Sequence, residues 1–434
     1  MKLKFDYFKS AILPFAAILA VCQPGLANPI ELTLDDSIAL AFKNNPAPQI
    51  AEAYREQAAW AVKDAQASKG FTVDFTHKDM RSTSPLSWMS TLAAISPYNY
   101  FSNQLTISLP LYTGGKLENT IEQAKLNYKV SELELTTTKQ ELKLNTTVGY
   151  YNVLQTENLL EIARQTVDDF NAHLKRVQDM YGSGAVAFHD VLQTKVKLAN
   201  AENSFVQAQN DYDLAVYSLN KTMGLPLRSE IKLKETLTYQ PYGLNLDDAT
   251  SYGLAHRPEM AQKQAQVEIA EKQVKIAQSN HQPTVSLTGT NAWDDNDFAG
   301  TNNRDWTAML ITQFNVFDSG STNSKIRQSQ SGKTAAQKQA QQTKDNMSLE
   351  ISDAYLSMRE AEKRIEKNKV AVEEAADSFD IAQTAYTAGV GTNLDVMDAE
   401  LALNQAKTNY INSLFDYNTS KARLDRAMGV YAGK

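Results

Sequence analysis

The sequence is poor in cysteine, and after residue 27 it has no long apolar run. Its 434 residues include one cysteine, Cys22, so disulfides and thiolate metal sites are excluded from the rest of the chain. The five histidines show no ligand spacing, and no Ser/His/Asp set, phosphate loop or dinucleotide fingerprint occurs. We therefore expect no enzyme, no metal site and no cofactor. The net charge of −7 argues against nucleic acid as a partner.

The N-terminal stretch has the pattern of an export signal. A lysine-containing start precedes the apolar run 11–22, and Gly25-Leu26-Ala27 forms a small-x-small cleavage site. We expect a cleaved signal peptide over residues 1–27. A lipid-anchored chain that begins at Cys22 is the alternative, which the bulky Val21 before it disfavours.

Proline is absent and glycine nearly absent from residues 114–180 and 320–385. At 1.5 Å per residue, helices of this length reach roughly 100 Å. In the second of them, apolar residues recur every seven positions in two series: Ile351, Met358, Ile365, Val372, Phe379 and Tyr386, and Ala340, Met347, Ala354 and Ala361. Two apolar seams require a neighbour on each side, whereas a two-stranded coiled coil needs one. This pattern predicts helices inside a curved helical wall.

The chain repeats itself at an offset of 205 residues. The phrase "YGSGAVAFHDVLQTK" (181–195) is echoed by "YTAGVGTNLDVMDAE" (386–400), and upstream, at an offset of 212, "LDD" (34–36) is echoed at 246–248. The offset changes from 212 to 205 residues between the two strands of each copy. Such a change is expected if an exposed loop of variable length joins these strands. A tandem duplication accounts for this pattern.

We expect two structural repeats, residues 28–224 and 246–430, joined by an equatorial linker 225–245 and followed by a short tail 431–434. The first repeat should contain helix 35–68 running past Pro46, strands 71–78 and 100–112, long helix 114–180, turn 181–186 and helix 188–223. The second should contain helices over 247–281, strands 284–293 and 305–317, long helix 320–385, turn 386–391 and helix 393–428.

The four strands alternate apolar and polar residues, as in "FTVDFTH" (71–77), which is typical of a sheet with two unlike faces. Together with an export signal, such strands are consistent with an outer-membrane barrel. Four strands cannot close, because about eight are the minimum for a packed barrel. Either the strands form a soluble sheet, or several chains complete one barrel, and three chains would supply twelve strands.

The strand-to-helix phrase "PLYTGGKLENTIEQAKLNY" (110–128) and the paired Tyr-x-x-Gly…Asp-Val turns resemble those of TolC-like outer-membrane efflux channels. The resemblance covers nearly the whole expected mature chain. It implies a mainly α-helical homotrimer, in which an α-helical barrel of long coiled-coil helices in the periplasm continues into a 12-stranded β-barrel in the outer membrane of a Gram-negative bacterium, with four strands per chain. It also implies a passive exit duct of a tripartite efflux pump or type I secretion system. Its partners would be a periplasmic adaptor protein, an inner-membrane transporter and outer-membrane lipid.

The duplicated turns are the first group of candidate site residues. Gly184 and Gly389 suit the left-handed conformation that ends a helix, so each turn should reverse a long helix into a shorter one. The resemblance implies that these tips meet the adaptor, which makes Tyr181, Gly184, Gly389 and Gly391 candidate docking residues. The strand–helix transitions form a second group: Pro110, Gly114, Gly115, Pro283 and Gly320.

Asp395 and Asp398 lie three residues apart, on one face of a helix start. The resemblance implies that they ring a closed periplasmic entrance and that Tyr386 belongs to the network that holds it shut. Six crowded carboxylates would favour cations and raise some of their own pKa values. The alternative is that Asp395 only complements the helix dipole. Gly391 stands where the family pattern can carry an arginine, so the closure would be weaker or built differently.

A secreted structural coiled coil or trimeric adhesin is the alternative function. The heptads alone would permit it, but it does not explain four amphipathic strands placed symmetrically between helices. Drugs, metal ions, siderophores and polypeptides all remain possible substrates of the proposed duct.

Overall fold

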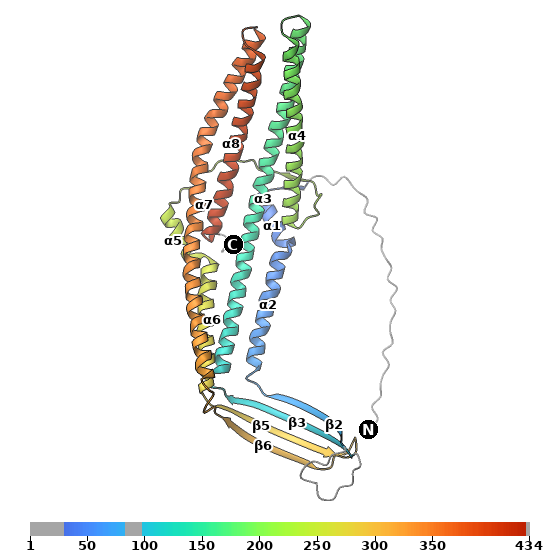
Figure 1. The fold of residues 1–434 in the computed structure, drawn as a ribbon, viewed down its shortest axis with the longest axis vertical. Helices are drawn as coiled ribbons and strands as arrows, with labels where there is room; N and C mark the ends of the chain where they lie inside the picture. Colours follow the sequence, from blue (N-terminus) through green and yellow to red (C-terminus); the bar gives the residue numbers. More distant parts are fainter. Residues whose placement is uncertain (1–29, 83–97, 431–434) are drawn as a thin grey trace.

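The computed structural model describes residues 30–82 and 98–430. The expected signal peptide, Cys22, the loop of the first hairpin and the tail 431–434 lie outside the described residues. The described chain is elongated, with a β-sheet at one end and two helical hairpin tips at the other (Figure 1).

The elements of the first half are β1 (Ile30–Leu32), α1 (Leu34–Asn44), α2 (Pro46–Ala67), β2 (Thr72–Ser82), β3 (Tyr98–Tyr112), α3 (Lys116–Gly182) and α4 (Phe188–Met223). Those of the second half are β4 (Ile231–Leu233), α5 (Leu246–His256), α6 (Pro258–Gln278), the short 3-10 helix η1 (Ser279–His281), β5 (Thr284–Asp295), β6 (Arg304–Gln313), α7 (Ser321–Thr387) and α8 (Asn393–Ala427). The long helices α3 and α7 have 67 residues each.

The expected continuous helix 35–68 was wrong, because the chain breaks at Asn45 into α1 and α2. Asn45 is extended, with φ −68° and ψ 133°, and its side chain accepts a hydrogen bond from the backbone N–H of Ala47. The residue before a proline is disfavoured in the helical region, and Pro46 is better placed as the first residue of a new helix. Arg257 and Pro258 form the same break between α5 and α6.

The helices form one wall, which has two successive halves along the length of the molecule. In the half nearer the tips the order is α7, α8, α3, α4, and in the half nearer the sheet it is α7, α6, α3, α2 (Figure 1). The long helices α3 and α7 therefore extend through both halves, while the shorter helices stack end to end beside them. This order leaves α7 at one edge of the wall, and α4 and α2 at the other.

Both apolar seams expected on α7 are covered by neighbouring helices. Ile351, Met358 and Ile365 of the first series are buried, as are all four residues of the second series, Ala340, Met347, Ala354 and Ala361. The largest core cluster lies midway along the molecule, where Tyr150, Leu219 and Tyr417 are fully buried. Both seams are covered although α7 lies at an edge of the wall, because α7 contacts α6 in the half nearer the sheet and α8 in the half nearer the tips.

Beyond the helices, the chain forms one antiparallel sheet in the order β2-β3-β5-β6. Strand β6 ends at Gln313, and not at residue 317 as expected, because its partner β5 begins at Thr284 opposite Gln313. Pro283, just before it, has no N–H to donate to the ladder. Strand β2 is longer than expected and reaches Ser82, because β3 supplies partners as far as Tyr98.

The linker between α4 and α5 is tied to the middle of the helical wall. Its strand β4 pairs in parallel with β1. The hydroxyl of Tyr239 donates to Glu362 (2.5 Å), and that of Tyr417 donates to the backbone oxygen of Gln240 (2.5 Å).

Across residues 30–82 and 98–430, no helix has the length and apolarity needed to cross a membrane.

Candidate functional site

The two hairpin tips have the same backbone geometry. Gly184 and Gly389 are left-handed, with φ of 78° and 77°. In the first tip the N–H of Gly184 donates to Tyr181 O (2.9 Å), and in the second that of Gly389 donates to Tyr386 O (3.0 Å). A Cβ at either glycine would meet nothing within 4 Å. Glycine is therefore required at these tips by the backbone conformation and not by a lack of space.

The two tip tyrosines lie in different surroundings. Tyr181 is 47% exposed and its ring packs against Phe188 at 5.5 Å, whereas Tyr386 is 4% exposed and packs against the ring of His173 at 5.3 Å. Burial raises the pKa of the Tyr386 hydroxyl, and the nearby charge of Asp190 adds to this effect. Only the first tip therefore presents an aromatic surface to solvent.

Asp395 and Asp398 are both exposed in the first turns of α8. The Asp395 carboxylate closes a capping box, in which it accepts hydrogen bonds from Thr392 N (2.9 Å) and Thr392 Oγ1 (2.6 Å). These bonds lower the pKa of Asp395 below its ordinary value. Asp395 thus has a structural role at the helix start.

Gly391 has no room for a larger residue. A Cβ built on it would lie 2.9 Å from the backbone nitrogen of Tyr386 and 3.1 Å from Ala385. An arginine could occupy this position only if the tip backbone moved.

At the strand–helix transitions, left-handed residues end the β3 and β6 segments and begin the long helices. Gly115 and Gly320, with φ of 84° and 83°, are the N-caps of α3 and α7. The preceding residues are also left-handed: Gly114 has φ 63° and Ser319 has φ 54°. For this reason α3 starts at Lys116, two residues after the expected position.

The remaining transition residues, Pro110 and Pro283, lie at the ends of β3 and β5 that are nearest the helices. The β3–β5 register is irregular between Pro110 and Tyr112, as expected where proline removes a ladder donor. The two junctions also touch, because a Cβ on Gly114 would lie 2.5 Å from the Cβ of Gln282, beside Pro283.

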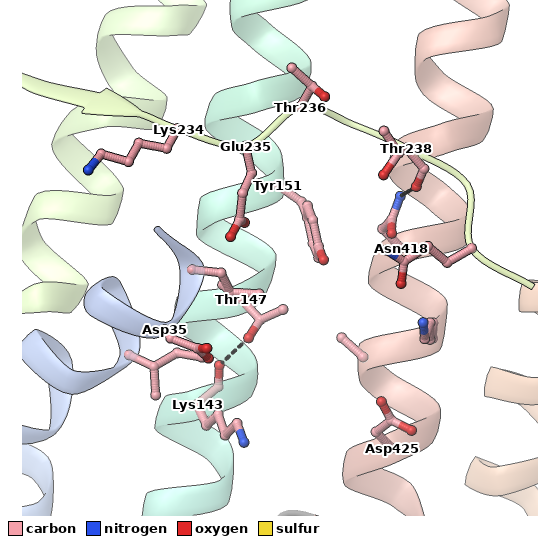
Figure 2. Close-up of a pocket in the computed structure, with 15 residues that line it drawn as sticks. Asp35, Lys143, Thr147, Tyr151, Lys234, Glu235, Thr236, Thr238, Asn418 and Asp425 are labelled. Atoms are coloured by element: carbon pink, nitrogen blue, oxygen red, sulfur yellow. Dashed lines mark hydrogen bonds between the residues drawn. The ribbon is translucent and has the colours of Figure 1, made fainter. Parts of the chain in front are cut away.

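A polar pocket of about 650 Å³ lies far from the tips, under the linker between α3 and α8 (Figure 2). Three lysines and three carboxylates line it: Lys143, Lys234, Lys421, Asp35, Glu235 and Asp425. Asp425 accepts a hydrogen bond from the Tyr242 hydroxyl (2.6 Å), and burial raises its pKa. Because the charges balance, the pocket has no excess of one sign that would select an ion.

Comparison with models of known protein families shows to which family this chain belongs. The model of the outer membrane efflux protein family matches residues 38–225 and 251–430. The chain belongs to the outer membrane efflux protein family. This membership confirms the family predicted from the strand-to-helix phrase and the paired turns.

Several known proteins are similar to this chain in sequence or in fold. The outer membrane protein TolC of Escherichia coli is 23% identical over 317 residues, which cover 69% of this chain and 64% of TolC, just under two thirds of that relative's length. The alkaline protease secretion protein AprF of Pseudomonas aeruginosa is 22% identical over 77% of this chain and 70% of its own. The crystal structure of the outer membrane protein VceC of Vibrio cholerae superposes with a TM-score of 0.81 at 20% identity, covering 91% of this chain and 96% of VceC.

Sequence reasoning missed one group of buried polar residues in this efflux protein. His173 was set aside because the histidines lack metal-ligand spacing, and Asn393 was taken only as the first residue of a helix. The structure brings them together across 220 residues of sequence, with His173 Nε2 at 2.7 Å from Asn393 Oδ1. No periodicity or local motif signals such a long-range pair.

Proposed function

We propose that this protein is the outer-membrane exit duct of a tripartite efflux pump or type I secretion system. It would conduct substrates passively from a periplasmic adaptor and an inner-membrane transporter to the exterior. The observation that carries the proposal is a sheet that is incomplete at both edges and apolar on one exposed face.

The two faces of the sheet differ in polarity. On one face, Phe75, Leu310 and Trp306 are exposed by 60%, 65% and 77%, and the strand register aligns them with other apolar residues: Val73, Leu105, Ile107, Leu109, Leu287 and Trp293. The opposite face is mostly polar: Asp74, Thr76, Gln104, Thr106, Ser108, Ser286, Thr288, Thr290 and Thr307. A large exposed apolar face marks an interaction surface. Alternation of this kind suits lipid on one side and a water-filled lumen on the other.

Both edges of the sheet, β2 and β6, lack a strand partner within the described chain. In lipid, each unpaired backbone group would be destabilising by several kcal/mol, so spanning sheets close on themselves. Three copies would supply three times four strands, or twelve, which exceeds the minimum of about eight. We infer a homotrimer in which β6 of one subunit pairs with β2 of the next.

The helical edges carry matching exposed apolar residues. On α7, Leu349, Leu356, Val370 and Ile381 are exposed. On the opposite edge, α4 exposes Leu192, Val196, Val206 and Leu214, and α2 exposes Ile50, Tyr54 and Trp60. Because α7 follows β6 while α2 precedes β2, one head-to-tail contact would cover the helical edges and pair the sheet edges together. Such a heterologous contact forms a ring when its rotation closes.

The proposed tandem duplication is supported by the backbone. Three pairs of glycines with positive φ lie 205 residues apart: Gly115 and Gly320, Gly184 and Gly389, and Gly224 and Gly429. In each copy, one long helix would extend from the barrel to the tip, and one tip turn would be available to the adaptor. Tyr181, Gly184, Gly389 and Gly391 are the residues we assign to this docking.

We also assign Asp395 and Asp398 to the narrow periplasmic entrance of the trimer, with Tyr386 packed beside it. Two carboxylates from each of three subunits would give six around one axis. Mutual repulsion would then raise some pKa values, in opposition to the lowering that the Thr392 cap produces in a single chain. The ring would attract cations and disfavour anions.

The test combines oligomeric state with conduction. We expect heat-resistant trimers in the outer-membrane fraction, and the purified trimers should produce discrete single-channel conductance in planar lipid bilayers. A secreted structural coiled coil or adhesin would instead be found without bilayer conductance. Monomers that remain folded in water would contradict the proposal, because the apolar face would then be stable in contact with solvent.

A further inference from the structure

The polar pocket under the linker is neutral overall, but its charged groups are separated. Asp35 of α1 and Glu235 of the linker lie toward the left of the view in Figure 2, and Asn418 and Asp425 of α8 lie on its right. Lys421, on the turn of α8 between these two residues, also lines the pocket. The pocket therefore presents carboxylates from α1 and the linker opposite an ammonium group from α8.

Lys421 forms no ion pair in the part of the chain that the structure describes, and its ammonium group lies 5.5 Å from the centre of the Tyr242 ring. The nearby Asp425 accepts a hydrogen bond from the Tyr242 hydroxyl (2.6 Å), and burial raises the pKa of this carboxyl group. Asp425 is therefore less able to neutralise the lysine. Lys421 keeps a positive charge that a bound anionic group could neutralise.

Asp35 is not needed to cap the helix that carries it. It is exposed in the first turn of α1, where the neighbouring Asp36 carboxylate closes the capping box with Thr33. Across residues 30–82 and 98–430, the Asp35 carboxylate has no hydrogen bond or ion pair of its own. It can therefore accept hydrogen bonds from a cationic group in the pocket, with Glu235 as a second carboxylate on the same side.

The proposed duplication provides a comparison for the α8 side of the pocket. The residues 205 positions before Lys421 and Asp425 are Val216 and Asn220 of α4. Val216 belongs to the largest core cluster, and Asn220 Nδ2 donates to the backbone oxygen of Leu227 (3.1 Å). The first half thus packs the equivalent helix with an apolar and an amide side chain. Packing alone therefore does not require the charges on α8.

The size and the charges of the pocket together indicate the class of ligand. Its volume of about 650 Å³ lies within the range of roughly 300–1,000 Å³ that is typical of small-molecule sites. A neutral pocket with separated charges suits a ligand that carries an ammonium group at one end and a carboxylate at the other. Asn418 adds a polar group for the middle of such a ligand. Its Nδ2 donates to Thr238 O (3.1 Å) and Leu414 O (2.8 Å), so both N–H groups are used and Oδ1 remains an acceptor.

We propose that this pocket binds a short zwitterionic peptide, with the peptide carboxylate at Lys421 and its ammonium group at Asp35 and Glu235. This role goes beyond conduction through the duct, and only its periplasmic setting rests on the proposed function. The pocket lies between α3 and α8, whereas the proposed subunit contacts use α7 on one edge and α2 and α4 on the other, so the trimer leaves it open. In the periplasm, such a peptide is either free or attached to the cell wall.

The test is isothermal titration calorimetry of purified, detergent-solubilised trimers with trialanine, which has one free ammonium group and one free carboxylate. N-acetyl-trialanine amide has the same backbone without these charges, and we expect it not to bind. Lys421→Met and Asp35→Asn each remove one charge, so each should weaken the binding of trialanine roughly ten- to hundredfold, the effect of one lost charge-assisted hydrogen bond. Lys407→Met is the matched control, because Lys407 lies about 21 Å away along α8 and donates to Gln165. It should leave the affinity unchanged.

Cosedimentation with purified cell-wall sacculi distinguishes the two sources of peptide. Trimers that sediment with intact sacculi, but not with sacculi whose peptides an amidase has removed, would identify the cell wall as the source, provided that Lys421→Met abolishes the effect. Binding of trialanine without cosedimentation would identify free peptide. Either result supports the peptide site.

The remaining outcomes separate the pocket from the duct itself. If neither trialanine nor sacculi bind, or if the blocked peptide binds as well as trialanine, the peptide site is wrong. Binding that both Lys421→Met and Asp35→Asn leave unchanged would overturn it too. If Lys421→Met forms no trimer, Asp35→Asn decides in the same way. Wild-type trimers that bind trialanine but never conduct in bilayers would contradict the duct and leave the peptide site in place.

Discussion

Replacement of Gly114 by alanine should be far more destabilising than the same change at Gly320. Both glycines are left-handed, with φ of 63° and 83°, which is unfavourable for alanine by roughly 1–2 kcal/mol. At Gly114 a Cβ would also lie 2.5 Å from Gln282 Cβ and 2.9 Å from the backbone oxygen of Ser279. Neither atom is the free end of a flexible side chain, and overpacking of this kind is destabilising by about 1–3 kcal/mol.

At Gly320 nothing lies within 4 Å of the new Cβ, so the effect of Gly320→Ala on stability comes from the backbone conformation and not from overpacking. In both variants alanine also restricts the unfolded chain, which offsets about 0.4–1 kcal/mol. This offset and the left-handed strain cancel in the comparison. The difference between the two variants should therefore equal the overpacking alone, about 1–3 kcal/mol. The adjacent Ser319, at φ 54°, shows that a side chain is tolerated in this conformation where space allows.

The assay is equilibrium urea unfolding of detergent-solubilised trimers, with wild type and both variants at one protein concentration because subunit association is linked to unfolding. Gly114→Ala should unfold at the lowest urea concentration, and Gly320→Ala should lie closer to wild type. Equal destabilisation would refute the reasoning, because it would mean that the two strand–helix junctions do not contact each other as described.

Three further predictions concern the entrance, the tips and the core. Asp395→Ala combined with Asp398→Ala should abolish cation selectivity and block by multivalent cations in planar bilayers; unchanged selectivity would remove both residues from the pore. Gly389→Asp should abolish efflux while the amount of surface trimer stays normal, because a charged, strained tip should no longer fit the adaptor; unimpaired efflux would contradict docking at this tip. Tyr150→Phe removes the buried hydroxyl that donates to Leu32 O (3.3 Å), so the free energy of unfolding should fall by about 0.5–1.5 kcal/mol; a larger loss would point to a rearranged core.

The sequence predicted those parts of the fold that local patterns determine. Long stretches without proline gave α3 and α7, and strict alternation gave the four strands. Their ends depended on partners that the pattern does not contain: β6 stops at Gln313 because β5 begins opposite it. The break at Asn45 was misjudged because Pro46 was treated as part of an existing first turn, whereas the cap makes it the start of a new helix.

The candidate site was predicted unevenly for the same reason. The left-handed backbone at Gly184 and Gly389 follows from residue type and position within the turn. By contrast, the burial of Tyr386 and the exposure of Tyr181, at equivalent positions in the two phrases, depend on which helices pack beside each tip. The pair His173 and Asn393 joins residues 220 positions apart, and only the packing of four helices brings them together.

Head-to-tail closure of the sheet by identical subunits is the central claim, and a cross-link between the two free edges tests it most directly. The expected mature chain has no cysteine, so Thr76→Cys on β2 and Thr307→Cys on β6 can be introduced together on the polar face and treated with a bifunctional thiol reagent. Closure predicts a ladder of covalent dimers and trimers that stops at three, with each single variant as the control. Links formed only within one chain, or a ladder that continues past three, would contradict it.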